Sequence, residues 1–406
     1  MSKRDELSGQ QAQAMRRIKR WYGSGASQTY RLFGYAGTGK TTLARKVAGH
    51  LGIGSVMYAA YTGKAAHVMR SKGCEGASTL HSLIYLPVEK VRAEADELKA
   101  ELNAERNADR RTEMLDRIRK LETDLSTPEW IVNRDSPLRD ADLLIIDEVS
   151  MVDEVMAKDV LSFGVPVLAL GDPAQLPPPR GSRAGYFTDA RPDYLLTEVH
   201  RQAAHSIVLE FATGVREGKR LIPQRYGSNS IYLPVSSKQA MRFGQVITGT
   251  NRERWRRIHK LRTLHGLDGD LPVPGDRVIC LKNNRDLDIF NGQMFSVVGS
   301  EPHGRDGIWL TVEGEDGAVL EIPAWRDGFR GMDQEKAFEA VAHRRRERAF
   351  MTYGWAITCH KSQGSQWGSV LIVDESRWFG KDRVKWLYTA ITRAEFRIAV
   401  ITPNGQ

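Results

Sequence analysis

The 406-residue sequence predicts an α/β protein with two domains, each built on a parallel sheet and each interrupted by an insertion. Short, continuous apolar runs at 143–146, 165–170 and 370–373 suit strands that are buried on both faces of such a sheet. Helical patterns separate these runs, as expected for right-handed β-α-β crossovers. The composition changes near residue 88 and again near 272, and these changes predict the two insertions.

The first domain is expected at residues 1–86 and 127–190, where strand-like and helix-like segments alternate. Residues 29–33 and 55–60 are short strand-like segments that precede helical patterns. Residues 87–126 instead consist largely of Glu, Arg, Lys, Asp and Ala, with Leu and Ile at helical spacing. We therefore predict a charged helical insertion, formed either by one long helix or by a helical hairpin broken near Asn107.

The second domain is expected at 191–271 and 346–406, with buried strands at 245–248, 370–373 and 397–401. Residues 272–345 have short alternating strands separated by Gly, Asp and Pro turns, which predicts a small β insertion. A basic run at 343–348 closes the insertion, and a polyanion contact and a solvated turn explain it equally well.

The bulk composition is that of an ordinary globular protein with a modest positive charge. Lys and Arg number 59 and Asp and Glu number 50, so the net charge of +9 is compatible with a polyanion partner without proving one. The three cysteines are widely spaced and lack metal-ligand spacing. No apolar run is long enough for a membrane span, and the polar N-terminus is unlike a signal peptide. We expect no membrane association and a cytoplasmic location, in a bacterial or phage-infected cell.

Residues 34–41 match the phosphate-binding pattern G-x-x-x-x-G-K-[ST] between a predicted strand and a predicted helix. Gly37 and Gly39 allow backbone conformations and close approaches that a β-carbon would obstruct. Lys40 can reach the β- and γ-phosphates of a nucleotide, and the Thr41 hydroxyl can bind Mg²⁺. The predicted nucleotide-binding residues are Gln11, Gly37, Thr38, Gly39, Lys40, Thr41 and Thr42.

Two acidic residues follow the apolar run 143–146 directly, at the edge of the sheet where ligands bind in parallel α/β proteins. Asp147 is predicted to hold Mg²⁺ together with Thr41, and Glu148 to act as a general base toward water. Gln175 lies in the turn after the next predicted strand. It could contact the γ-phosphate or the water, although a plain turn amide explains it as well.

Arg201 and Arg393 are candidates for stabilising the negative charge that develops on a transferred phosphoryl group. Both lie in the predicted second domain, so either could make hydrolysis depend on contact between the domains. Taken singly, each would more simply be a surface ion pair, and their assignment depends on the surrounding segments.

Together, these segments resemble superfamily 1 helicases of the 5′→3′ branch, of the RecD and phage Dda type. The resemblance covers residues 7 to about 394 and consists of segments in the family's order. They are Leu7–Gln11, Gly34–Thr41, Thr62–Ala66, Thr79–Leu83, Asp147–Met151, Gly171–Pro178, the segment around Arg201, His360–Ser365 and the segment around Arg393.

The resemblance implies two RecA-like P-loop domains that bind ATP and Mg²⁺ between them, with an SH3-like fold for the second insertion. It implies that Gln11 contacts adenine and that single-stranded DNA crosses both domains. The implied DNA contacts are Thr62, Lys64, His81, Thr250, Asn251, His360 and Ser362. Asn291-Gly292 resembles the lead into the SH3-like insertion, and a hairpin turn explains it equally well.

Two features depart from the family or leave a role unassigned. The chain has Gln366-Trp367 where the family usually carries an acid, which puts a ribose or DNA contact at this position in doubt. No residue of the first insertion stands out as a strand-separating wedge, and Tyr85, Leu86 and Trp130 are only candidates.

The resulting hypothesis is an ATP-dependent DNA helicase that moves 5′→3′ on single-stranded DNA, separates duplex at ss/ds junctions and works as a monomer. Its pathway could be replication, recombination or repair, and proteins of replication or recombination are candidate partners. Three alternatives share most of the motifs: a translocase that strips proteins from nucleic acid, a nucleotide-switched DNA-binding loader, and an enzyme that acts on RNA.

Overall fold

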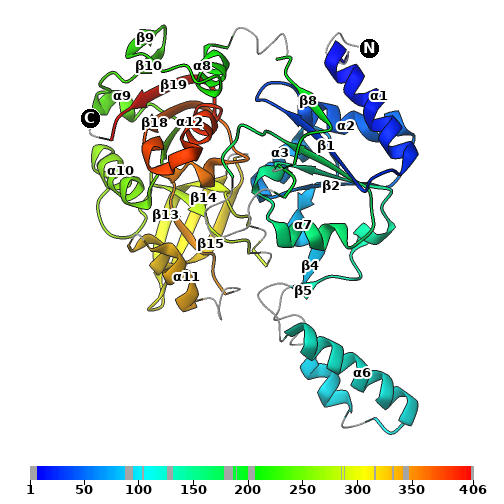
Figure 1. Cartoon of the computed structure of the whole chain (residues 1–406). Coiled ribbons are helices and arrows are strands. Elements are labelled where there is room, and N and C mark those ends of the chain that lie inside the picture. Colours follow the sequence, from blue (N-terminus) through cyan, green and yellow to red (C-terminus); the bar gives the residue numbers. More distant parts are fainter. Residues whose placement is uncertain are drawn as a thin grey trace.

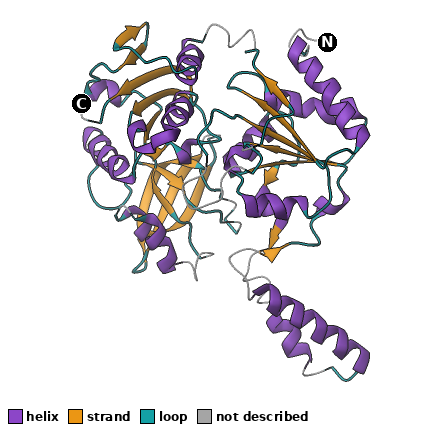
Figure 2. Ribbon diagram, viewed as in Figure 1, coloured by secondary structure: helices purple, strands orange, loops and turns teal. Residues whose placement is uncertain are grey.

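The computed structural model consists of two α/β lobes side by side, with a separate helical hairpin that projects from the first lobe (Figure 1). It describes residues 7–86, 95–102, 105–125, 131–177, 186–188, 190–199, 206–284, 286–287, 289–314, 317–331, 333–341 and 347–403. Each lobe has a sheet flanked by helices (Figure 2). No helix among these residues has the length and apolar character needed to span a bilayer.

The first lobe contains a six-stranded sheet in which every neighbouring pair is parallel. In spatial order its strands are β3 (Ser78–Thr79), β2 (Val56–Ala60), β6 (Leu143–Asp147), β7 (Val167–Gly171), β1 (Thr29–Gly34) and β8 (Tyr194–Leu196). Strands β6 and β7 are buried along their whole length, as the apolar runs predict. The parallel α/β fold predicted for this half is confirmed.

Helices of the first lobe begin where the sequence offers capping side chains. They are α1 (Gly9–Ser24), α2 (Lys40–Leu51), α3 (Gly63–Ser71), α4 (Leu80–Ile84) and α7 (Glu154–Leu161). At α1, Ser8 and Gln11 form a reciprocal capping box, which satisfies two backbone N–H groups at the helix start. Among these helices only α2 lacks a side-chain cap, because its N-cap residue is Gly39, and this exception lies in the phosphate loop.

The charged insertion is a helical hairpin, the second of the two forms that the sequence left open. Residues 95–102 form one helix and α6 (Ala108–Leu125) forms the other, with the break near Asn107. A short two-stranded sheet of β4 (Tyr85–Leu86) and β5 (Ile131–Val132) joins the hairpin to the lobe. Apolar residues of the hairpin and of β4 and β5 form a small core of their own, made of Ala95, Leu98, Leu121, Leu86 and Ile131.

The second lobe contains another six-stranded sheet, which is parallel except for one edge strand. Its order is β17 (Ala356–Thr358), β11 (Gln245–Thr248), β18 (Trp367–Val373), β19 (Ala394–Ile401), β10 (Asn229–Ile231) and β9 (Gln224–Tyr226), with β9 antiparallel to β10. Its helices are α8 (Ile207–Arg216), α9 (Ser237–Ala240), α10 (Asn251–Leu264) and α12 (Arg383–Ile391).

The β insertion of the second lobe is one five-stranded antiparallel sheet with a helix between its last two strands along the chain. In order it contains β15 (Val319–Trp325), β14 (Gly307–Gly314), β13 (Met294–His303), β12 (Arg277–Cys280) and β16 (Met351–Tyr353), and α11 (Gln334–Val341) precedes β16. Its apolar residues share one core with α10 and β11 of the lobe. Whether this sheet is of the SH3-like kind stays a prediction.

Two of the expected domain boundaries differ from the sheet pairings. The sequence predicts that the second domain starts at residue 191, but β8 at 194–196 pairs with β1 and so extends the first sheet. It also predicts that the β insertion ends at 345, but β16 at 351–353 pairs with β12 and completes the inserted sheet. In both cases a short strand joins a distant partner, and its own sequence does not say which partner it takes. Part of the basic run, residues 343–346, lies outside the described residues.

Candidate active site

The phosphate loop connects β1 to α2 and has the backbone conformation that its glycines predict. Gly37 and Gly39 have φ angles of 79° and 76°, which strongly favour glycine. A β-carbon on Gly34 would lie 2.9 Å from the Leu196 β-carbon, so glycine is also needed where the loop leaves β1. Because Gly39 offers no side chain to the N-terminus of α2, the first backbone N–H groups of this helix stay available to an anion.

Lys40 and Thr41 lie at the start of α2 and face groups that match their predicted roles. The Lys40 ammonium donates to the Gly34 carbonyl at 2.6 Å and to the Tyr35 carbonyl at 3.3 Å, which holds it over the loop. The Thr41 hydroxyl donates to Oδ2 of Asp147 at 2.8 Å. A hydroxyl and a carboxylate thus meet beside the loop, and this donor set suits Mg²⁺, which takes few protein ligands and completes its shell with phosphates and water.

Gln11, Thr38 and Thr42 differ in how they relate to the loop. The Gln11 amide donates to the Thr38 carbonyl at 3.2 Å, so α1 is fastened to the phosphate loop. Thr38 is buried and its hydroxyl donates to the Tyr35 carbonyl at 2.8 Å, which stiffens the loop. Thr42 is exposed on the first turn of α2.

Glu148 immediately follows β6 and has a strained backbone. Its φ angle is 55°, a conformation uncommon for residues other than glycine. Its N–H donates to Oδ1 of Asp147 at 2.8 Å. Burial raises the pKa of the Glu148 carboxyl, and the Arg393 guanidinium opposes this rise. The carboxyl is therefore well placed to accept a proton, and it lies close enough to Arg393 to interact with its charge.

Arg393 comes from the second lobe and is almost fully buried, with 4% of its surface exposed. Its guanidinium donates to the carbonyls of Thr389 and Ser365 at 3.0 and 3.3 Å, and to the Thr392 hydroxyl at 3.1 Å. These neutral acceptors fix the side chain without neutralising it. The structure thus brings Arg393 toward Glu148 rather than into a surface ion pair. Arg201, the other arginine candidate, lies outside the described residues.

Gln175 lies in the turn after β7, and its side chain is buried. Its amide oxygen is inaccessible and, within the described ranges, accepts no hydrogen bond. An unpartnered amide oxygen is unusual for a group whose only role is in a turn. Gln175 therefore retains a hydrogen-bonding capacity that its surroundings leave unused.

The two lobes make direct polar contacts around the phosphate loop, and the sequence did not indicate them. The Tyr388 hydroxyl of α12 donates to Oδ2 of Asp172 at 2.7 Å and accepts from the Ala36 N–H at 2.9 Å. One hydroxyl thus joins the second lobe to the loop and to the turn that contains Gln175. Nearby, the guanidinium of Arg216 lies 3.6 Å from the centre of the Tyr35 ring.

A second set of contacts ties the turn after β7 to the second lobe. The Leu176 N–H donates to the Thr389 hydroxyl at 2.8 Å, and the Gln363 amide donates to the Leu176 carbonyl at 2.7 Å. Sequence reasoning identified the segments that contain Gln363 and Thr389 but gave neither residue a role. Their side chains form part of the contact through which a movement of one lobe can affect the other.

The predicted strand contacts of the first lobe lie near the start of α3 and on α4. The Thr62 hydroxyl caps α3 by accepting from the Ala65 N–H at 3.2 Å. The Lys64 ammonium lies 5.2 Å from the centre of the Trp367 ring, at the position where the family's acid is missing. His81 packs between Tyr61 and Tyr85, and burial lowers its pKa, so the imidazole is neutral at pH 7.

The start of α3 is also in close contact with the second lobe. A β-carbon on Gly63 would lie 2.6 Å from the Phe290 β-carbon. A β-carbon on Gly364 would lie 2.8 Å from the Thr62 hydroxyl oxygen and 3.0 Å from the Ala65 β-carbon. Both glycines are therefore required for the approach of the lobes in this structure.

Among the predicted contacts of the second lobe, only Asn251 is exposed, and its side chain makes no hydrogen bond within the described residues. Thr250 caps α10, and its N–H and hydroxyl both donate to Glu375. His360 packs against Phe379, and burial lowers its pKa. Ser362 is fully buried and its hydroxyl donates to the Cys359 carbonyl at 2.7 Å, so the structure does not present it to a strand.

The wedge candidates are also not supported as such. Tyr85 is 5% exposed and its hydroxyl donates to Asp159 at 2.6 Å, so its ring belongs to the core of the first lobe. Leu86 packs against the core of the hairpin. Trp130 lies outside the described residues.

Two family models match parts of the chain. Residues 6–230 match a family model described as an AAA domain, and residues 353–401 match one described as a UvrD-like helicase C-terminal domain. The ATP-dependent RecD2 DNA helicase of Deinococcus radiodurans is 31% identical over 281 residues. That match covers 63% of this chain and 36% of RecD2, so the chain spans little more than a third of the length of this relative.

Solved structures of Pif1 helicases have a similar fold. The Candida albicans Pif1 helicase is 19% identical with a TM-score of 0.52, and the match covers 98% of this chain and 94% of that one. Bacteroides Pif1 bound to ssDNA is 18% identical with a TM-score of 0.54, over 97% of this chain and 92% of that one. At this identity the similarity demonstrates a shared fold.

Proposed function

Because this chain belongs to the AAA-domain family, within the RecD- and Pif1-like part of superfamily 1, we propose that it is an ATP-dependent DNA helicase. It moves 5′→3′ on single-stranded DNA and separates duplex. The RecD2 relative is named an ATP-dependent DNA helicase, and one Pif1 neighbour was solved bound to ssDNA.

The observation that carries the proposal is the position of Arg393 at the phosphate loop. This guanidinium comes from the second lobe, is buried, and interacts with the Glu148 carboxyl of the first lobe. A cation at this place, hydrogen-bonded to neutral acceptors, can stabilise the charge that develops on a γ-phosphate during hydrolysis. Hydrolysis then requires the two lobes to be in contact, and this requirement is what a motor needs to couple chemistry to movement.

The first lobe supplies the remaining groups of the proposed reaction. The loop N–H groups and Lys40 hold the phosphates, and Thr41 and Asp147 would hold Mg²⁺, which when bound would offset phosphate charge. Glu148, with its raised pKa, takes the proton of the attacking water. The amide oxygen of Gln175, buried and unpartnered in this structure, could accept a hydrogen bond from the same water once a movement of the turn after β7 exposes it.

Movement requires the affinity for the strand to differ between nucleotide states. A ligand shifts a conformational equilibrium only if it binds one conformation more tightly than the other. Contacts between the lobes offer the link: Tyr388 joins the second lobe to the phosphate loop and to Asp172. Groups that face the strand, such as Lys64 and Asn251, lie on the same two lobes. The relative positions of these groups therefore change when the cleft opens.

Replacing Lys40 by alanine tests the chemical part of the proposal. We expect strand-stimulated ATP hydrolysis to fall by at least about 100-fold, since the Lys40 ammonium is held at the phosphate loop, where it would bind the β- and γ-phosphates. Thermal unfolding should be nearly unchanged, because the hydrogen bonds of the Lys40 ammonium go to two carbonyls of the loop itself. Turnover at the wild-type rate would remove Lys40 from the mechanism.

A tailed-duplex assay tests the direction and the strand separation. Duplexes with a 5′ overhang should be unwound in the presence of ATP, and those with a 3′ overhang should not. Unwinding of only the 3′-tailed substrate contradicts the 5′→3′ assignment. Strand-stimulated hydrolysis without unwinding of either substrate identifies the protein-stripping translocase. This second candidate function is kept because Tyr85, a candidate for the strand-separating wedge, is buried. An RNA strand in place of DNA in the hydrolysis assay tests the third alternative.

A further inference from the structure

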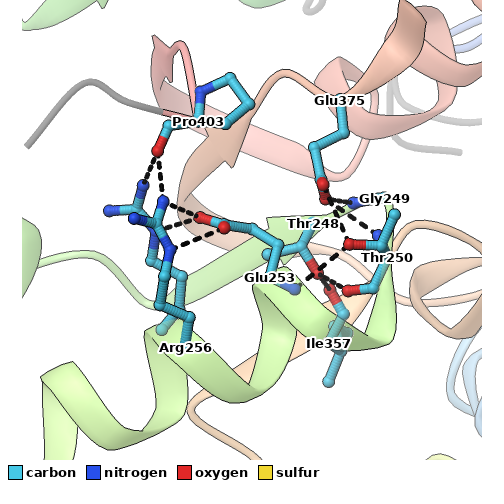
Figure 3. Close-up of polar contacts among 9 residues, drawn as sticks. Thr248, Gly249, Thr250, Glu253, Arg256, Ile357, Glu375 and Pro403 are labelled. Carbon is cyan, nitrogen blue, oxygen red and sulfur yellow. Dashed lines mark hydrogen bonds and ion pairs between the residues drawn. The ribbon is translucent and has the colours of Figure 1, made fainter. Parts of the chain in front are cut away.

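The turn that starts α10 is held by a carboxylate from a distant part of the chain (Figure 3). Glu375 follows β18, and its Oε2 accepts the N–H groups of Gly249 and Thr250 at 2.7 and 2.9 Å. Its Oε1 accepts the Thr250 hydroxyl at 2.9 Å. Glu375 is only 5% exposed, so these bonds are shielded from water.

The turn has little freedom around Glu375. A β-carbon on Gly249 would lie 2.7 Å from the Glu375 β-carbon and 3.0 Å from Cε2 of Phe379. The Thr250 hydroxyl oxygen also accepts the Glu253 N–H at 3.2 Å, which caps α10. Glu375 therefore fixes both the path of the backbone and the first turn of the helix.

These bonds leave Thr250 with no donor for a strand. Its N–H and its hydroxyl both point to Glu375, while the next two residues, Asn251 and Arg252, are exposed. Neither of the latter two side chains makes a hydrogen bond or ion pair within the described ranges. Their polar groups are thus free for contact, and the direction in which they project depends on the turn that precedes them.

We propose that Glu375 is a positioning residue for strand binding. By fixing the Gly249–Thr250 turn, it holds Asn251 and Arg252 in the orientation that contacts the sugar-phosphate backbone. This inference rests on the proposed DNA-binding function and adds to it a residue outside the recognised motifs. It also moves the strand contact of this turn from Thr250 to the two residues that follow.

Electrostatics and positioning predict opposite effects when the charge of Glu375 is removed. A carboxylate close to a strand repels phosphates, so a purely electrostatic role means that Glu375→Gln binds DNA more tightly. If Glu375 orders the turn, the same change loosens it, and binding then includes the cost of ordering it again. A glutamine keeps the size of the side chain but cannot accept all three bonds, because one oxygen becomes an NH₂ group.

The test measures binding of a fluorescently labelled oligothymidine strand to the full chain by anisotropy, without nucleotide. For Glu375→Gln we expect the dissociation constant to rise about fivefold or more, because the turn must be ordered on binding. The matched control is Glu253→Gln, which removes the same charge from a buried carboxylate on α10 that pairs with Arg256 and Arg257. The control should bind the strand within about twofold of wild type, because its side chain does not touch the turn.

A hydrolysis assay separates positioning from a general loss of structure. For Glu375→Gln, the strand concentration for half-maximal stimulation should rise by the same factor as the dissociation constant, while the maximal rate stays near that of wild type. A fall in the maximal rate with no change in this concentration contradicts the inference. So does equal or tighter strand binding by Glu375→Gln.

A double-variant cycle asks whether Glu375 acts through Thr250. Thr250→Val should weaken binding and Thr250→Ser should restore it, since serine keeps the hydroxyl that Glu375 accepts. Combining Thr250→Val with Glu375→Gln should add little to the larger single effect, because both changes break the same contact. Fully additive effects overturn the inference. If the wild-type chain does not bind the strand, the proposed function itself is wrong. If the wild type binds and Glu375→Gln binds equally well, only the inference about Glu375 is wrong.

Discussion

Replacing Tyr388 by phenylalanine should weaken the contact between the lobes without changing the core around the ring. The hydroxyl makes two bonds across the cleft, one to the Asp172 carboxylate and one from the Ala36 N–H. Burial and the neighbouring Asp172 raise the pKa of Tyr388, so the hydroxyl stays protonated and donates throughout the usual pH range. Phenylalanine keeps the ring and removes only this bridge.

The size of the effect follows from the kind of bonds that are lost. A hydrogen bond to a charged group contributes about 1.5–3 kcal/mol and a neutral one about 0.5–1.5 kcal/mol. Opening of the cleft returns Asp172 and Ala36 to water, which offsets part of this loss. We therefore expect the closed form to lose about 2 kcal/mol relative to the open form, or about 30-fold in the equilibrium between them.

The assay is steady-state ATP hydrolysis at saturating DNA strand, with Tyr85→Phe as the control. Tyr85 also donates to a carboxylate, Asp159, but both residues belong to the first lobe. Tyr388→Phe should lower the maximal rate by up to about 30-fold, whereas Tyr85→Phe should lower only the thermal stability. An unchanged rate for Tyr388→Phe, or equal losses for both variants, would refute the link between this hydroxyl and closure.

Three further predictions follow from other parts of the molecule. Asp276→Ala leaves the buried Arg262 guanidinium without its carboxylate partner. The free energy of unfolding, measured by urea denaturation, should therefore fall by about 3–5 kcal/mol, and a change below about 1 kcal/mol contradicts this prediction. Burial lowers the pKa of His81 and His360, so both are mostly neutral at pH 7 and raising the pH from about 7 to 8 removes little charge from them. The affinity for the strand should therefore stay constant over this pH range. If the wild type loses affinity as the pH rises and the double variant His81→Gln/His360→Gln does not, the imidazoles are charged and the prediction is wrong. Replacing residues 95–125 by a short linker should leave strand-stimulated hydrolysis intact, because the hairpin has its own core; loss of hydrolysis would show that it supports the active site.

The sequence was sufficient for the part of the site that is local in the chain. The loop from Gly34 to Thr41 and the acids after β6 are predictable, because a continuous motif and a buried apolar strand fix where they lie. That Thr41 and Asp147 meet also follows from the topology of a parallel sheet. These predictions required no knowledge of side chains far away.

Contacts between distant segments were not predictable in the same way. Tyr388 and Asp172 are 216 residues apart, and Glu375 and Thr250 are 125 apart. A single tyrosine or glutamate carries no pattern that names its partner. The burial of Ser362 was missed for a related reason, since a serine in a polar motif gives no sign of whether its hydroxyl faces outward or toward the backbone. The pairing of short strands such as β8 was not predicted, because the neighbouring strand, here β1, decides which sheet they join.

The glycines at 63 and 364 make the seam between the lobes sensitive to a single methyl group. An alanine at either position would push against Phe290 or against Thr62 and Ala65, none of which belongs to the phosphate loop. At 364 the φ angle of 75° adds a backbone penalty to this collision, whereas Gly63 starts α3 and carries the steric effect alone. Gly63→Ala is thus a means of holding the two lobes apart while every residue proposed to bind phosphate remains in place, and it would allow the open form to be studied by itself.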